Sequence, residues 1–175
     1  MNFRSLRLGV LAGAALCAVS SPAFSTTLQE MSLDAIVDSS EAIVMGEAVS
    51  SRVVNTESGV YTLTDFQVSE TLSGSAPSTV TVSVPGGSYE TASGFRVGEV
   101  IAGAPQLLPG RKAVLFLERD AATGEMCVVG FSQGQMSVAS GPNGIVLSGA
   151  GHANMGLGQL KAVIESAGSG KGSVE

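Results

Sequence analysis

The sequence predicts a mainly β domain: a small closed barrel of about seven strands, with a short N-terminal helix and a C-terminal helix. Two observations favour this class. Short segments rich in β-branched residues alternate with polar residues along most of the chain, and glycine-rich turns separate them. In addition, Gly46 lies inside the first such segment, and closing a barrel requires sharp local bends of the kind that a glycine permits.

The first expected element is a short helix. Ser32 is a suitable N-cap. Leu33, Ile36 and Val37 then recur at the spacing of one helical face. We expect this helix to end near residues 39–40, where two serines follow the apolar positions.

The expected strands come next, separated by turns. In residues 60–68, valine, threonine and phenylalanine share one face, whereas the other face is polar, as in a half-solvated strand. Residues 111–118 are the most continuously apolar and are therefore expected to form the central strand. Asn143-Gly144 is a strong hairpin signal. The full set of expected strands is 42–49, 60–72, 80–84, 111–118, 126–131, 135–139 and 144–147.

The chain ends in a second helix, expected over residues 156–167. Its apolar residues mark one helical face, and Gly168 suits the position after a helix end. The remaining residues, 168–175, are small and polar and are predicted to be a flexible tail. Residues 26–167 are thus expected to form one domain, which at about 150 residues is large enough for a single core.

Residues 1–25 have the pattern of a signal peptide. Arg4 and Arg7 supply the positive charge, and the apolar run of residues 8–19 is too short for a membrane span, which needs about 20 residues. Small residues favour cleavage before Thr26, with a cut after Ala23 as the alternative. We therefore expect a periplasmic or secreted protein with no transmembrane anchor after cleavage. An uncleaved anchor is the competing interpretation.

Charge and cysteine content exclude several classes. Cleavage would remove two arginines and no carboxylate, which leaves seven basic residues against fifteen acidic ones. Nucleic acid and anionic lipid are therefore not expected partners, because both require clustered lysine and arginine. Cys17 would leave with the signal, so Cys127 could form no internal disulfide, and its apolar neighbours predict a buried, unreactive thiol.

No catalytic set, cofactor site or metal site is predicted. Residues 130–134 (G-F-S-Q-G) match the G-x-S-x-G pattern of a hydrolase nucleophile, but no acid lies between Ser132 and His152, the single histidine. We interpret the two glycines as turn or bulge positions and His152 as an exposed loop residue. A lone histidine and a lone cysteine offer no zinc ligand set.

Carboxylates leave one enzymatic alternative open. Asp120 and Glu125 bracket an expected hairpin loop, and Glu41 and Glu47 lie at either end of the first strand. None of them lies in a calcium-loop pattern. A small hydrolase that uses two carboxylates remains an alternative, because such residues can come from any part of a chain.

The least regular region, residues 86–110, is the candidate interaction loop. Long ordered loops often carry function, and Tyr89, Phe95 and Arg96 combine exposed aromatic rings with a cation, which suits a protein-binding patch. In the alternative interpretation, Phe95 and the apolar residues 100–101 fold back as a lid over the end of the barrel.

The order of elements resembles a known layout. The segments that carry the resemblance are 42–49 (AIVMGEAV), 60–62 (VYT), 72–74 (LSG), the strand ending at Pro85, 108–111 (LPGR) and 114–117 (VLFL). Together they resemble the netrin-like, OB-like β-barrel of the N-terminal domain of tissue inhibitors of metalloproteinases, over roughly residues 28–140. The chain is also similar to small exported bacterial proteins of unknown role, in which a G-F-S-Q-G stretch tends to recur.

The resemblance implies a fold and no mechanism. The inhibitor family chelates a protease zinc through an N-terminal cysteine, whereas the mature chain is expected to start at Thr26 and lacks the family's disulfides. No functional residue is carried over. We expect a non-enzymatic binding module of the bacterial envelope, whose partner is another exported protein or an envelope ligand. The alternatives are a secreted protease inhibitor that inserts a loop and the carboxylate-dependent hydrolase.

Overall fold

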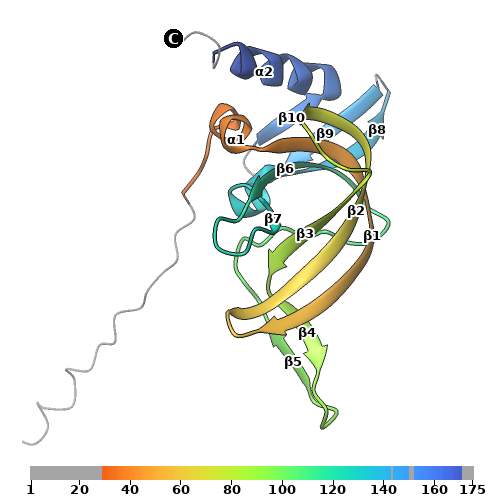
Figure 1. Ribbon diagram of the computed structural model, residues 1–175. Coiled ribbons are helices and arrows are strands. Elements are labelled where there is room, and N and C mark those ends of the chain that lie inside the picture. The colour runs from red at the N-terminus through yellow and green to blue at the C-terminus, as the bar shows by residue number, and fades with distance from the viewer. Residues whose placement is uncertain (1–28, 143, 150–151, 171–175) are drawn as a thin grey trace, which may run out of the picture.

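The computed structural model describes residues 29–142, 144–149 and 152–170 (Figure 1). The expected signal peptide, 1–25, and residues 171–175 of the expected tail lie outside these residues. The elements are α1 (Leu33–Ser39), β1 (Ala42–Thr56), β2 (Gly59–Gly74), β3 (Thr79–Pro85), β4 (Gly87–Glu90), β5 (Arg96–Glu99), β6 (Lys112–Arg119), β7 (Met126–Val128), the 3-10 turn η1 (Phe131–Gly134), β8 (Gln135–Gly141), β9 (Gly144–Gly149), β10 (His152–Gly156) and α2 (Leu157–Gly170).

The predicted mainly β class is confirmed, but the strand number is higher than expected. The described residues contain ten strands in place of about seven. Two of the additional strands, β4 and β5, lie inside the region expected to be an irregular loop, and β10 was expected to be a small-residue loop around His152. These three strands are short and contain glycine, so they lack the apolar alternation that identifies a strand from sequence.

The main sheet is mixed and bends back on itself. Along the sheet the strand order is β1-β2-β3-β7-β6-β8-β9-β10, and β1 also pairs with β6. Strands β1, β2, β3, β7 and β6 are therefore linked in a circuit. Its β3–β7 link is a single parallel residue pair, Val82 with Met126. Strands β8, β9 and β10 extend beyond this circuit, so the sheet is not a regular barrel.

The bulge expected near Gly46 is present. The β1–β2 register shifts between Met45 and Gly46, on a strand that is far longer than the predicted 42–49. A Cβ atom on residue 46 would overlap the carbonyl oxygen of Gln67 and lie 2.8 Å from Cε1 of Phe66. Only a glycine therefore lets β1 approach β2 this closely while it bends.

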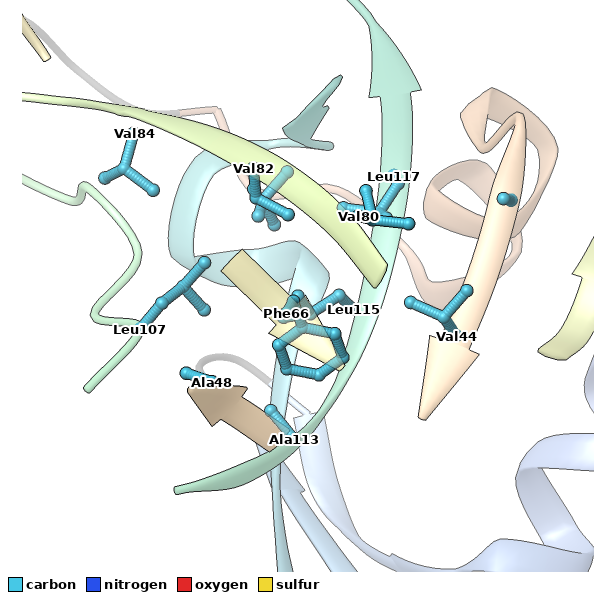
Figure 2. Close-up of a cluster of buried hydrophobic side chains, with 12 residues drawn as sticks. Val44, Ala48, Phe66, Val80, Val82, Val84, Leu107, Ala113, Leu115 and Leu117 are labelled. Carbon is cyan, nitrogen blue, oxygen red and sulfur yellow. The ribbon is translucent and has the colours of Figure 1, made fainter. Parts of the chain in front are cut away.

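Two apolar cores lie on opposite faces of β1 and β6. Strand β6 is buried on both faces over residues 113–117, as expected for the central strand. Leu115 and Leu117 point with Val44 and Phe66 into the inner core, which the circuit of strands surrounds (Figure 2). The outer core lies under the helices and contains Ile36, Val37, Ile43, Val114, Phe116, Val129, Met136, Leu147, Leu160 and Ile164.

The two helices cover the outer core at one end of the molecule (Figure 1). As predicted, Ser32 caps α1, and its hydroxyl accepts a hydrogen bond from the Ala35 amide at 3.2 Å. Helix α2 buries Leu160 and Ile164 and continues to Gly170, beyond the predicted end at residue 167. Neither described helix has the length and apolar character needed to cross a bilayer.

Candidate functional site

The region 86–110 consists of a hairpin followed by an irregular segment. Strands β4 and β5 form a separate two-stranded sheet, in which Tyr89 pairs with Val97 and Glu90 pairs with Arg96. This hairpin projects from the end of the molecule opposite the helices (Figure 1). The expectation of an irregular loop is therefore corrected for its first half, because cross-strand pairing orders residues with little intrinsic strand pattern.

Polar contacts tie the hairpin to the β1–β2 hairpin. The Asn55 side-chain amide donates to the Tyr89 hydroxyl at 3.1 Å, and the Val60 amide donates to a carboxylate oxygen of Glu99 at 3.4 Å. At the base, the Gly86 amide donates to the Val60 carbonyl at 2.7 Å, and the Thr62 hydroxyl donates to the Gly86 carbonyl at 2.8 Å. The hairpin is thus held in one orientation at its base and along one face.

The base of the hairpin also requires a glycine. Gly87 has a φ of 147°, and a Cβ atom there would lie 2.6 Å from Oγ1 of Thr62 and 3.0 Å from Cγ1 of Val53. This close approach allows β4 to begin directly against the inner surface of β1 and β2.

The three predicted interaction residues occupy different places on the hairpin. Tyr89 is half-buried and accepts the hydrogen bond from Asn55, so it serves as a tether. Phe95 ends the tip turn and is 72% exposed, and Arg96 begins β5 and is exposed as well. The sequence reasoning missed Asn55, since no local signal links it to a residue 34 positions away.

The tip turn is itself ordered by hydrogen bonds. The Thr91 amide donates to the Phe95 carbonyl at 2.8 Å, and the Phe95 amide donates to the Thr91 hydroxyl at 3.1 Å. The Gly94 amide donates to the Thr91 carbonyl at 2.9 Å. Phe95 and Arg96 are therefore presented on a turn whose backbone is closed by its own contacts.

The structure contradicts the lid interpretation for Phe95 and Val100, because neither side chain folds back over the end of the barrel. Val100 is 95% exposed and Val97 is 42% exposed, so the hairpin and the residue after it present apolar side chains to solvent. From this region Leu107, which is 8% exposed, belongs to the inner core (Figure 2), and Ala104 packs against that core. The sequence does not distinguish Leu107 from its neighbour Leu108, since both are leucines in the same segment. Only the structure shows that Leu107 is buried and Leu108 is exposed.

A cavity of about 400 Å³ lies between the hairpin, the segment 104–109 and the inner face of β2. Comparisons with family models, curated proteins and solved structures find no match for this chain.

The G-F-S-Q-G segment forms a 3-10 turn and not a strand-to-helix elbow. Gly130 and Phe131 both have positive φ, 61° and 60°. Among the described non-glycine residues, Phe131 is the one with a positive φ. The Gln133 side chain accepts from the Met31 amide at 2.8 Å and donates to the Gln29 carbonyl at 3.0 Å. The segment thus anchors the N-terminal stretch. His152 lies in β10, and its side chain is outside the described features.

Two of the candidate carboxylates, Asp120 and Glu41, make local structural contacts. Asp120 accepts from the Ala122 and Thr123 amides and from the Thr123 hydroxyl, and these hydrogen bonds hold its pKa below the usual 3.8. Glu41 forms an ion pair with Arg119 at 3.1 Å. Cys127 was expected to be buried and is half-buried; this partial burial, followed by the charges of Glu118 and Asp120, raises its pKa to about 11. Among the described residues no group of three potential ligands could hold a metal.

Proposed function

We propose that this chain is an exported, non-enzymatic binding module whose β4–β5 hairpin binds an extended segment of another exported protein. The observation that carries the proposal is the exposure of Phe95, 72%, on a hairpin tethered to the body of the fold, and of Val100, 95%, in the residue that follows it. A tethered hairpin loses little conformational freedom on binding, so the burial of its apolar side chains contributes more fully to affinity.

The edge of β5 favours an extended protein segment as the occupant. Among the described strands β5 pairs only with β4, and all four of its residues are exposed. An unpaired strand edge offers amide and carbonyl groups to an incoming strand, and the neighbouring apolar side chains supply specificity. Phe95 and Arg96 are also of the residue types that dominate protein interfaces.

We also propose that the fold is an OB-like barrel of the netrin-like layout and that residues 1–25 direct export to the periplasm or medium. The circuit β1-β2-β3-β7-β6, with a parallel β3–β7 contact and a long bent β1, supports the barrel. Strands β8, β9 and β10 are additions to it. The composition of residues 1–25 supports export.

Site-specific photocrosslinking tests the binding function. A photoreactive phenylalanine analogue is placed at position 95 or 100 in cells of the native host, and at Thr71, exposed on β2, as the control. We expect one discrete protein adduct from positions 95 and 100, absent at 71 and lost when Val97→Asp is added. Adducts of equal yield at all three positions, or none at 95 and 100, would contradict the proposal. Far-ultraviolet circular dichroism checks that the variants fold.

The ordered tip turn favours one alternative, a protease inhibitor that inserts this turn. Phe95 and Arg96 are side chains that serine-protease specificity pockets accept, and the turn is closed by contacts to Thr91. A panel of secreted serine and metalloproteases is assayed with wild-type protein and with Phe95→Ala and Arg96→Ala. Inhibition that either substitution abolishes would support this alternative. Unchanged hydrolysis rates at micromolar protein would remove it.

A further inference from the structure

A cavity of about 630 Å³ lies away from the hairpin tip, between the segment 104–112, the 3-10 turn η1 and strands β8 and β9. Its floor is the edge of the inner core, where Ala48, Phe66, Leu107 and Ala113 gather (Figure 2). Its walls carry seven side chains able to form hydrogen bonds. These are Gln106, Arg111, Lys112, Ser132, Gln135, Ser137 and Ser148.

The charge of this cavity is opposite to that of the protein. No carboxylate is among the described residues that line it, although the chain has fifteen acidic residues against nine basic ones. Arg111 and Lys112 both line it, and Lys112 also lines a second cavity, which it shares with Glu47. A cleft lined by charge of one sign concentrates ions of the opposite sign.

The two cations are not used by the fold. Within the described residues, three of the other four cations, Arg52, Arg119 and Lys161, form ion pairs with Asp65, Glu41 and Glu70 respectively, and the fourth, Arg96, lies exposed on the hairpin. Neither Arg111 nor Lys112 has an ion pair or a side-chain hydrogen bond in that part of the chain. Glu47 lies opposite Lys112 in the β1–β6 register, but it is not within ion-pair distance.

The wall that faces these cations is fixed in place. The Gln135 side chain accepts from the Gln106 amide at 3.0 Å and donates to the Gln106 carbonyl at 2.9 Å. The Ser132 amide donates to the Gly103 carbonyl at 2.9 Å. The backbone of residues 103–106 is therefore attached to η1 and β8, so the cavity has its shape without a ligand.

We infer that this cavity binds a small organic anion, of the size of a sugar acid or sugar phosphate. Arg111 and Lys112 would donate charge-assisted hydrogen bonds to the oxyanion, and the serine hydroxyls would donate to its remaining oxygens. The apolar floor formed by Phe66 and Leu107 suits the carbon skeleton of the ligand. The volume lies within the range of ordinary small-molecule sites, roughly 300–1,000 Å³. This inference does not depend on the hairpin function.

Titration followed by backbone amide NMR tests the inference at constant ionic strength. The probes are glucuronate, glucose 6-phosphate and inorganic phosphate, with glucose as the neutral control. We expect saturable shifts at Arg111, Ser132 and Gln135 with at least one organic anion, and none with glucose. The first two probes show whether a carboxylate or a phosphate is preferred. If glucose binds equally well, or if neither organic anion gives saturable shifts, the inference is wrong.

Variants locate the binding to this cavity. Arg111→Gln/Lys112→Gln should weaken anion binding by about tenfold or more, since each lost charge-assisted hydrogen bond is worth about a factor of ten. Ser137→Glu, which places a carboxylate in the cavity from an exposed position on β8, should weaken it similarly. Arg96→Gln, a matched exposed cation on the hairpin, should leave it unchanged. Wild-type affinity in both cavity variants would overturn the inference.

Discussion

Two threonines on the inner face of β2 differ in whether their hydroxyl group is hydrogen-bonded, and this difference decides how each should respond to the same substitution. Thr64 is fully buried, and its hydroxyl has no hydrogen-bond partner among the described residues. Thr62, two residues away, donates to the buried Gly86 carbonyl at 2.8 Å. Replacing either threonine with valine keeps the shape and the β-branched character and removes only the hydroxyl group.

Thr64→Val should therefore stabilise the fold, and Thr62→Val should destabilise it. Removing an unpaired buried hydroxyl relieves a desolvation cost of about 1–3 kcal/mol. Removing a hydroxyl that is hydrogen-bonded should cost about 1–2 kcal/mol, because the Gly86 carbonyl also loses a partner. In a domain of this size each kcal/mol shifts Tm by about 2–4 °C, so the two variants should differ by roughly 4–20 °C.

Thermal and urea unfolding, followed by circular dichroism, measure both changes against wild type. Equal m values would show that the two variants unfold as wild type does. If Thr64→Val lowers the free energy of unfolding as much as Thr62→Val does, then the Thr64 hydroxyl is satisfied in solution and the reasoning from its isolation is refuted.

Three further predictions concern single residues. Gly46→Ala should lower the free energy of unfolding by at least about 1–3 kcal/mol in urea, because its Cβ would overlap the Gln67 carbonyl; Gly158→Ala, with open space in α2, is the control and should not destabilise. Hydrogen bonds from Ser50 and Thr81, with the Arg52 charge, hold the pKa of Asp65 below 3.8, so its stabilisation is present above that pH and is lost as pH falls through the lowered value. The stability difference between wild type and Asp65→Asn should shrink in acid, and a constant difference between about pH 6 and about pH 2 would contradict this. Because the pKa of Cys127 is raised to about 11, iodoacetamide should alkylate the native thiol far more slowly than the urea-unfolded one at neutral pH. Mass spectrometry measures both alkylation rates. Equal rates would be inconsistent with the burial of this thiol.

Part of the candidate site was accessible to sequence reasoning. The region 86–110 was identified because it is long, irregular and aromatic, and the structure places Phe95 and Arg96 at an exposed tip. The separate roles of the residues inside this region could not be predicted from sequence. Tyr89 acts as a tether and Leu107 enters the core, and both roles depend on contacts with β1, β2 and β3.

The cavity at Arg111 and Lys112 was missed for a similar reason. The sequence shows these two cations as an adjacent pair, but it does not show that the carboxylates lie elsewhere. The opposite wall comes from η1 and β8, and its contact with Gln106 joins residues 29 positions apart. A cleft formed across such separations leaves no local pattern.

The sequence by itself determined the mainly β class, the two helices, the cap at Ser32, the bend at Gly46 and the central position of β6. Each of these follows from short-range periodicity or from the conformation of one residue. Tertiary structure alone decided that β1 pairs on both sides, that weakly patterned segments become β4, β5 and β10, and that a cationic cavity forms in an acidic protein. The physical reason is that pairing partners and cavity walls are chosen by the burial of surfaces far apart in the chain, which local propensity does not encode.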